Sequence, residues 1–313
     1  MGEKVTVVGS FAVGMTIRSP VMPAYGQTLL GSDFDMGPGG KGSNQAVAAR
    51  RLGADTALVA NIGADALGGI ATDLYRAEGV DRRHLRELKD RATGVGFIIL
   101  NTAGDNFIIL DMGANETLCP ADVDAAAETI DDSRVVMAVL EIPLDAAQRA
   151  LELGRASGAI TILNPAPARL LPPSIFPYVD VLTPNESELR ILLGLRPDDR
   201  RSSRELAREL RKQGVGRVVV TLGGKGALVL TDDIDLMVPA PAVEVVDTTG
   251  AGDAFNAGLA VALAEGRDLV AAVHFAVCAG AHACTKLGVV PALGQRHEID
   301  RLEARQTTEV ATT

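Results

Sequence analysis

A glycine-rich segment in the last third of the chain carries the strongest chemical signal. Residues Asp247–Asp253 read Asp-Thr-Thr-Gly-Ala-Gly-Asp and precede Ala254–Ala264, an almost wholly apolar stretch that is typical of a buried helix. Backbone N–H groups in the first turn of a helix have no intrahelical partner, and the helix dipole favours negative charge there. Small residues let an anion approach those groups closely. We therefore predict that Gly250, Ala251 and Gly252 form a cradle for a phosphate or an oxyanion.

Asp253 follows this cradle directly. A carboxylate at the rim of an anion site suits a general base that takes a proton from an attacking hydroxyl. The alternative is that Asp253 only complements the helix dipole, as acidic residues in first turns often do. The residues before the segment, Val243–Val246, are strand-like, so we expect a strand-to-helix junction here.

A second glycine cluster, Gly37–Asn44, also leads from a strand into a helix, which we expect over Gln45–Leu52. Its GxGxxG spacing matches the dinucleotide-binding fingerprint. The preceding residues Asp33–Met36 are polar, however, and the next strand ends in Asn61 where that fingerprint has an acidic residue. We predict instead a backbone that approaches a polyhydroxylated ligand, because Asn44 can both donate and accept hydrogen bonds.

These junctions require a framework of alternating strands and helices. Short β-branched runs (VTVVG, TALVANIG, VVMAVLE, AITILNP, VDVLTPN and RVVVTLG) alternate with Ala/Leu/Arg stretches of helical period. This pattern predicts an α/β fold, a mainly parallel sheet with helices on both faces. Residues 12–36 and 93–111 break the rhythm and predict a small antiparallel lid sheet. We expect a single domain over residues 1–313 with a disordered tail over 304–313.

Composition narrows the functional classes. The 313 residues include 30 basic and 40 acidic side chains and no tryptophan, which disfavours nucleic acid as a partner. The Arg-rich segment 196–211 interleaves acidic residues at helical spacing and predicts a salt-bridged, solvated helix face. The chain has no run of 18 apolar residues, no signal-peptide pattern and three cysteines without CxxC spacing. We therefore predict a cytoplasmic protein without membrane contact or disulfides.

Both glycine segments resemble the diagnostic motifs of the ribokinase, or phosphofructokinase-B (PfkB), family of carbohydrate kinases. They read GPGGKGSNQAVAARRLGA and DTTGAGDAF, and the resemblance extends over nearly the whole chain. LNPAPA and TPNESE are similar to the family's nucleotide and magnesium segment, and TLGGKG is similar to its ATP loop. The resemblance implies a three-layer α/β/α ribokinase-like fold. It also implies an ATP- and Mg²⁺-dependent kinase that transfers the γ-phosphate to a primary hydroxyl of a pentose or related sugar.

The resemblance also assigns roles to individual residues. Asp253 would be the general base, and the cradle would hold the oxygens of the transferred group. The implied sugar ligands are Gly39, Gly40, Lys41, Asn44, Glu141 and Asp253. The implied ATP contacts are Asn185, Thr221, Gly223, Gly226 and Gly252, and Asn185 and Glu188 would hold Mg²⁺ through water.

The family's potassium activation and dimerisation give two further expectations. Asp247 and the carbonyl of Thr249 match K⁺ ligand positions, and Cys284, Leu287 and Val289 lie near the others. Ala292 stands where relatives commonly have a serine ligand. Because lids pair in ribokinase-like dimers, and exposed lid edges otherwise invite uncontrolled pairing, we expect a homodimer through the lid strands.

The first strand departs from the family pattern. Ribokinases usually carry G-S-x-N-x-D there, and the Asn and Asp hold sugar hydroxyls, whereas this chain has Ala12 and Gly14. Free ribose is therefore not the expected best substrate. The alternatives are a nucleoside kinase, with Phe11, Phe97 and Phe107 as candidate base contacts, or a family kinase for a ketose, deoxyribose or 2-keto-3-deoxygluconate. A sugar-responsive binding protein without turnover is a further alternative.

Overall fold

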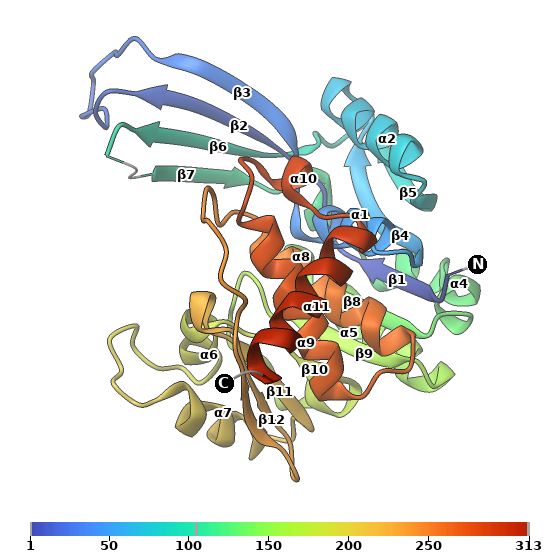
Figure 1. Ribbon diagram of the computed structural model, residues 1–313. Helices are drawn as coiled ribbons and strands as arrows, with labels where there is room; N and C mark the ends of the chain where they lie inside the picture. Colours follow the sequence, from blue (N-terminus) through green and yellow to red (C-terminus); the bar gives the residue numbers. More distant parts are fainter. Residues whose placement is uncertain (1, 104–105, 312–313) are drawn as a thin grey trace.

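A nine-stranded sheet forms the middle layer of the computed structural model, which describes residues 2–103 and 106–311 (Figure 1). Neighbouring strands are parallel except for β11–β12 and β12–β13 at one edge. The strands lie in the order β13 (Asp235–Val238), β12 (Ala227–Leu230), β11 (Arg217–Thr221), β10 (Val181–Leu182), β9 (Ile160–Asn164), β8 (Val135–Val139), β1 (Lys4–Val8), β4 (Asp55–Gly63) and β5 (Asp81–Leu88). The predicted mainly parallel sheet is confirmed.

Helices cover both faces of this sheet because its central strands are apolar on both sides. Val7 and Val8 are both buried, but they belong to separate apolar cores on opposite faces. One core contains residues of α1 (Lys41–Arg51), α2 (Ala66–Glu78), α8 (Ala251–Ala264), α9 (Leu269–Ala283), α10 (Val289–Ala292) and α11 (Arg296–Ala311). The other contains residues of α3 (Pro120–Asp124), α4 (Ala127–Asp131), α5 (Leu144–Ser157), α6 (Glu186–Leu192) and α7 (Ser203–Arg211).

Helix α8 is buried from Asp253 to Ala264. Small residues allow this, since a Cβ added at Gly258 would lie 3.0 Å from the Cβ of Ala279 in α9. Close packing holds the first turn of α8 in a fixed place. The predicted strand before it is wrong: Val245 and Val246 are 61% and 57% exposed and lie outside the sheet, and the N–H of Val246 bonds to the carbonyl of Cys284 at the end of α9.

The lid is a second, four-stranded sheet that projects from the body (Figure 1). Its strands lie in the order β3 (Ser32–Gly39), β2 (Ala12–Ser19), β6 (Gly94–Asn101) and β7 (Asn106–Asp111). β2 and β3 form an antiparallel hairpin, and β6 and β7 form another. β2 and β6, the two central strands, pair in parallel, so the expected antiparallel arrangement is wrong at the centre of the sheet. The reason is that β2 and β6 both run outward from the body as the first strands of their hairpins. Residues 104 and 105 lie outside the described residues.

The last described helix is α11, which extends to Ala311, so residues 304–311 are helical where we expected a disordered tail. The buried side chain of Gln306 donates a 2.6 Å hydrogen bond to the carbonyl of Pro239 and accepts one from the Cys278 thiol. The spacing of apolar residues in the sequence gives no information about such hydrogen bonds. Residues 312 and 313 lie outside the described part of the chain.

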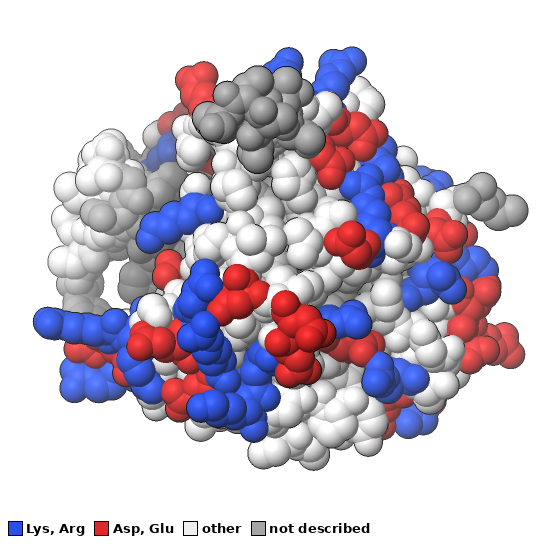
Figure 2. All heavy atoms as spheres, turned by 60° about the horizontal axis from the view of Figure 1, so that its bottom comes forward, with Lys and Arg blue, Asp and Glu red and all other residues white. Residues whose placement is uncertain are grey.

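Charged side chains of both signs are interspersed over the face shown in Figure 2. The predicted salt-bridged segment is present, since Arg201 pairs with Glu209 at 2.8 Å and Arg208 pairs with Asp235 at 2.5 Å around α7. Among the described residues, no helix combines the length and the apolar character needed to cross a lipid bilayer.

Candidate active site

The predicted site residues gather where the parallel strands end. β1, β8, β9, β10 and β11 all run toward the same edge of the sheet, and the first turns of α1 and α8 lie near it. The carboxyl edge of a parallel sheet is the usual ligand site of open α/β folds. The structure therefore brings together the two glycine segments, which are about 200 residues apart in sequence.

Asp253 is the centre of this arrangement. Its side chain is 6% exposed, Oδ2 accepts a 2.8 Å hydrogen bond from Asn44 Nδ2, and Oδ1 accepts a 3.0 Å bond from Gln45 Nε2. Burial raises the pKa of Asp253 above its ordinary value, although Lys41 and the two amide donors oppose the shift. The Oδ1 atom of Asn44 is buried and has no protein partner among the described residues. It is therefore available to accept from a ligand hydroxyl.

The first turn of α8 presents unused donors beside this carboxylate. Gly250 begins the helix with φ +80°, a conformation that favours glycine. The N–H groups of Gly250, Gly252 and Asp253 have no partner in the described part of the protein, whereas that of Ala251 donates to the Thr248 carbonyl at 3.2 Å. A Cβ at Gly252 would meet nothing within 4 Å, so this position faces open space. This turn therefore offers the N–H groups of Gly250 and Gly252 for the predicted cradle, Ala251 is the least available of the three predicted donors, and Asp253 adds a donor that we did not predict. The binding of an anion there stays a prediction.

The first turn of α1 is closed. Its donors are satisfied within the protein, because the N–H of Lys41 bonds to Glu141 Oε2 at 2.7 Å and that of Ser43 bonds to the Ser10 carbonyl at 2.8 Å. The Ser10 hydroxyl also donates to Glu141. A Cβ at Gly40, which has φ +88°, would lie 2.7 Å from the backbone nitrogen of Ala12. A glycine at position 40 is therefore required by the close approach of this turn to Ala12, and the expected contact of its backbone with a ligand stays a prediction.

Lys41 lies among three carboxylates. Burial lowers its pKa, but the charges of Asp253, Glu141 and Glu188 outweigh burial and leave the pKa raised. Burial also raises the pKa values of Glu141 and Glu188. Lys41 therefore stays charged between the α8 cradle and the segment that carries Glu188.

Asn185 and Glu188 form a capping box at the start of α6. The Asn185 side chain accepts from the Glu188 N–H, and Glu188 Oε2 accepts from the Asn185 N–H, each at 2.8 Å. An isolated bridge pairs Asn185 with Thr221, which brings the two predicted ATP segments together. After Thr221, Gly223 begins the short 3-10 turn Gly223–Lys225, and Gly226 caps it. A Cβ at Gly226 would collide with the Val238 carbonyl, whereas a Cβ at Gly223 would meet no atom within 4 Å.

The donors near α6 fit a magnesium ion held mainly by water and phosphate. No cluster of three or more His, Cys, Asp or Glu side chains that could hold an ion occurs within residues 2–103 and 106–311. Mg²⁺ needs no such cluster, because it retains several waters and uses one or two carboxylates beside substrate phosphates. Only Oε2 of Glu188 is used in the capping box, which leaves its other oxygen without a protein hydrogen bond in the described structure.

The predicted potassium ligands lie at the other end of the α8 junction. Asp247 accepts from the Thr249 N–H at 2.9 Å and from the Gly288 N–H at 3.1 Å. Partial burial opposes ionisation, but these hydrogen bonds outweigh it and lower the pKa of Asp247. The Cys284 carbonyl already accepts the N–H groups of Val246 and Asp247, at 2.8 and 3.2 Å. Ala292, at the position where relatives commonly have a serine, carries no hydroxyl.

Sequence reasoning missed a set of buried polar side chains behind Asp253. They are Gln45, Asn164, Thr183 and Asn256. A signal was present in the sequence, since Asn164 ends the apolar strand β9, Thr183 follows the apolar strand β10, and Asn256 interrupts the apolar helix α8. A buried amide without an evident partner in sequence predicts a hydrogen-bond network.

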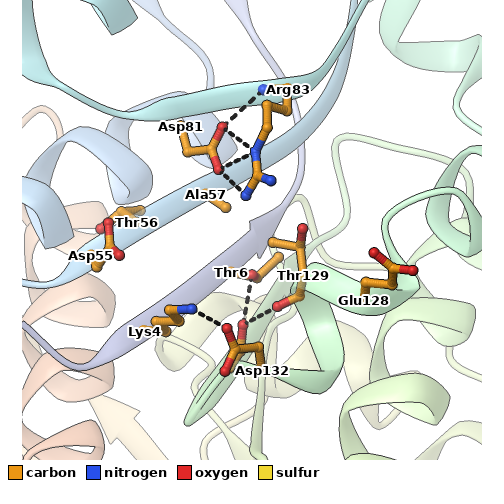
Figure 3. Close-up of a pocket in the computed structure, with 11 residues that line it drawn as sticks. Lys4, Thr6, Asp55, Thr56, Ala57, Asp81, Arg83, Glu128, Thr129 and Asp132 are labelled. Atoms are coloured by element: carbon orange, nitrogen blue, oxygen red, sulfur yellow. Dashed lines mark hydrogen bonds and ion pairs between the residues drawn. The ribbon is translucent and has the colours of Figure 1, made fainter.

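A cavity of about 280 Å³ lies at the opposite edge of the sheet (Figure 3). It is lined at the starts of β1, β4 and β5, where the Lys4 side chain pairs with Asp132 and Arg83 pairs with Asp81. These ion pairs neutralise its two cations within the protein. The hollow shares no residue with the site around Asp253.

Comparisons with known proteins place the chain among carbohydrate kinases. A family model described as pfkB family carbohydrate kinase matches residues 3–295. The chain is 35% identical to a ribokinase of Haemophilus influenzae over 298 residues, covering 95% of this chain and 97% of that protein. It is 36% identical to a deoxyribokinase of Salmonella typhi, covering 91% and 93%. An Arabidopsis thaliana ribokinase structure, complexed with ribose and ATP, superposes with a TM-score of 0.90 at 29% identity and covers 97% of this chain and 99% of that one.

The raised pKa of Asp253 predicts an unusual effect on stability. Above about pH 4, the ordinary carboxyl range, the folded protein must hold a buried charge that the unfolded chain holds in water. Asp253→Asn removes that charge and should increase the free energy of unfolding at pH 7.5 by about 1 kcal/mol. The gain should shrink as the pH falls toward 4, because a raised pKa means that the wild-type carboxyl takes up its proton more readily in the folded protein than in the unfolded chain. Urea denaturation at both pH values measures it.

Asp247→Asn is the matched control. Because the pKa of Asp247 is lowered, its ionised form stabilises the fold, so this variant should be less stable than the wild type at pH 7.5. Equal destabilisation by both variants at pH 7.5 would contradict the assignment of a charge-strained Asp253.

Proposed function

The chain belongs to the pfkB family of carbohydrate kinases, and on this basis we propose that Asp253 is the general base with which it transfers the γ-phosphoryl group of ATP to a primary sugar hydroxyl. The protein is a ribokinase-like sugar kinase, a phosphotransferase that acts on a sugar hydroxyl. One observation carries the residue assignment: a buried carboxylate adjoins three unused N–H groups in the first turn of α8.

The proposed step moves one proton and one phosphoryl group. As the sugar oxygen attacks the γ-phosphorus, its proton passes to a free lone pair of the Asp253 carboxylate, and the bond to the ADP oxygen breaks. Asn44 and Gln45 already donate to that carboxylate, so they cannot compete for the proton. The N–H groups of Gly250, Gly252 and Asp253, together with Lys41, stabilise the negative charge of the transferred group.

Two cations complete the proposal. Asn185 and Glu188 would hold Mg²⁺ through water, and the ion would neutralise charge on the ATP phosphates. Asp247 and the Thr249 carbonyl would contribute to a potassium site. We propose only weak K⁺ activation, because the Cys284 carbonyl is already occupied and Ala292 offers no hydroxyl.

Asp253→Asn tests the base assignment. The variant keeps the shape of the side chain but cannot accept the proton, so kcat should fall about 100-fold or more while sugar binding changes little. ATP consumption with Mg²⁺, in K⁺ and in Na⁺, measures kcat, and calorimetry measures sugar binding. Wild-type rates in the two salts should differ only slightly. A variant that keeps a tenth of the wild-type kcat would disprove the assignment.

The acceptor is proposed to be a pentose with fewer hydroxyls than ribose, such as a 2-deoxypentose. Ala12 and Gly14 lie on one face of β2, at the positions where the family pattern places hydroxyl ligands, and a Cβ at Gly14 would meet only the Gly37 carbonyl at 3.8 Å. The missing Asp contact costs about 1.5–3 kcal/mol of binding to the hydroxyl that it would hold, and the missing Asn contact costs about 0.5–1.5 kcal/mol. The similarity to a deoxyribokinase supports this choice.

The nucleoside alternative loses its candidate base contacts. Phe11 is fully buried and packs edge-on against Tyr75. Phe97 and Phe107 lie on the lid face opposite to Gly14, since Gly14 pairs with Gly96 and strand neighbours alternate between faces. These three aromatic side chains therefore do not line the sugar side of the lid.

Acceptor preference can be measured directly and then altered. The wild type should give a kcat/KM for 2-deoxyribose at least equal to that for ribose. Gly14→Asp should raise kcat/KM for ribose about 10-fold by restoring a hydroxyl ligand. Gly69→Asp, which adds the same charge at another open position on α2, should leave it unchanged. A wild type that prefers ribose 10-fold would show that another group holds those hydroxyls.

We also propose a homodimer through the lid. The face opposite to Gly14 carries Met36, Phe97 and Ile109, and the last two are 53% and 59% exposed. A contiguous exposed apolar surface of this kind marks an interaction site. The face that carries Ala12 and Gly14 is the one proposed to cover the sugar. The opposite, apolar face is therefore left for a second copy of this lid, which would bury it.

Ile109→Lys should therefore convert the dimer into a monomer, because it would bury an unpaired charge between the lids. Ile191→Lys, at an exposed apolar position on α6, is the matched control and should remain dimeric. Sedimentation velocity at micromolar concentration distinguishes the two states. A wild type that sediments as a monomer would refute the proposal.

A further inference from the structure

The buried polar side chains behind Asp253 form a closed ring. Gln45 Nε2 donates to Asp253 Oδ1 and to Asn164 Oδ1, each at 3.0 Å. Asn164 Nδ2 then donates to the Thr183 carbonyl at 3.3 Å, and the Thr183 hydroxyl donates to Asn256 Oδ1 at 2.6 Å. Asn256 Nδ2 donates to the Gly252 carbonyl at 2.8 Å, which returns the ring to the residue before Asp253.

The ring joins elements that are far apart in sequence. Gln45 lies on α1, Asn164 ends β9, Thr183 follows β10, and Asn256 lies on α8. Their exposed fractions are 0%, 6%, 1% and 2%. Thr183 also begins the segment that carries Asn185 and Glu188. These hydrogen bonds therefore hold Asp253, the first turn of α8 and the segment that begins at Thr183 in fixed positions relative to one another.

The ring has features that a purely structural role does not require. Apolar side chains would fill this space without the desolvation that buried amides suffer. Moreover, Gln45 Oε1 is buried without a partner among the described residues, so the amide orientation serves its two donors. One of these hydrogen bonds goes to the carboxylate of Asp253 and the other to Asn164, so the Gln45 amide fixes Asp253 Oδ1 relative to the end of β9.

We propose that Gln45 is a positioning residue of the transfer reaction, which anchors Asp253 Oδ1 through this ring and leaves the remaining lone pairs of the carboxylate for the acceptor hydroxyl. The inference rests on the proposed function of Asp253 as the base. It adds that the geometry of the base is set by a residue that touches neither sugar nor ATP.

The electrostatics around Asp253 give this role a measurable signature. The charged groups that influence it are Lys41 on α1, Glu141 after β8 and Glu188 on α6. Lys41, Asn44 and Gln45 favour the ionised carboxylate, whereas burial opposes it. Removal of the Gln45 donor should therefore raise the pKa of Asp253, and activity should be lost at a higher pH as the solution is acidified.

Three variants test the proposal. Gln45→Met keeps the length of the side chain but removes both donors, and should lower kcat at least 10-fold while the KM values for ATP and sugar change less than 3-fold. The acid limb of its pH–rate profile should move up by about one unit. Gln45→Glu adds a carboxylate beside Asp253 and should move the limb further. Thr183→Val opens the ring far from Asp253 and should lower kcat a few-fold with the limb unchanged.

Gln148→Met, on the surface helix α5, is the matched control and should match the wild type. If Gln45→Met does not fold, the order of the acid limbs in wild type and Gln45→Glu decides the question. Wild-type kcat and an unmoved acid limb in both Gln45 variants would overturn the positioning role. Absence of kinase activity in the wild type would instead overturn the proposed function itself, so the two failures are distinguishable.

Discussion

A buried carboxylate that must remain ionised is the constraint on which the rest of this structure depends. Water stabilises a carboxylate far better than a protein interior does, so Asp253 must recover that stabilisation from fixed donors and charges. They come from separate elements: two amides and a lysine from α1, and the helix end of α8. Each contribution falls off steeply with distance, and the close packing of α8 against α9 is what keeps these groups in register.

The two glycine-rich junctions look alike in sequence but perform opposite electrostatic tasks. At α1, Glu141 and Ser10 occupy the helix end from within the protein. At α8, three donors remain unused among the described residues, and Gly252 faces open space. Negative charge is thereby directed to one helix end only. Lys41 lies at the helix end whose N–H groups are already paired, and its ammonium group interacts with the carboxylates of Asp253 and Glu188.

The lid shows how a small sheet can have two functional faces. One face carries the glycines of β2, β3 and β6 in register, Gly14 with Gly37 and Gly96. The side chain of Leu110 in β7 lies on the same face and packs against Gly96. The other carries large apolar residues on neighbouring strands. Because strand residues alternate between faces, a change of one residue in register would exchange the two surfaces. The parallel pairing of β2 with β6 fixes that register at the base of the lid.

The sequence by itself determined the chemistry and the class of fold. Strands that are apolar on both faces require helices on both sides of the sheet. An anion site can be predicted from small residues at the start of a helix, and Asp253 follows them directly in the sequence. Only the tertiary structure decided which helix end is open, that Val243–Val246 is not a strand, and that the tail is anchored through Gln306. It also closed the ring from Gln45 to Asn256. The physical reason is that these outcomes depend on hydrogen-bond partners up to 209 residues apart, whereas periodicity and local motifs report only on neighbours.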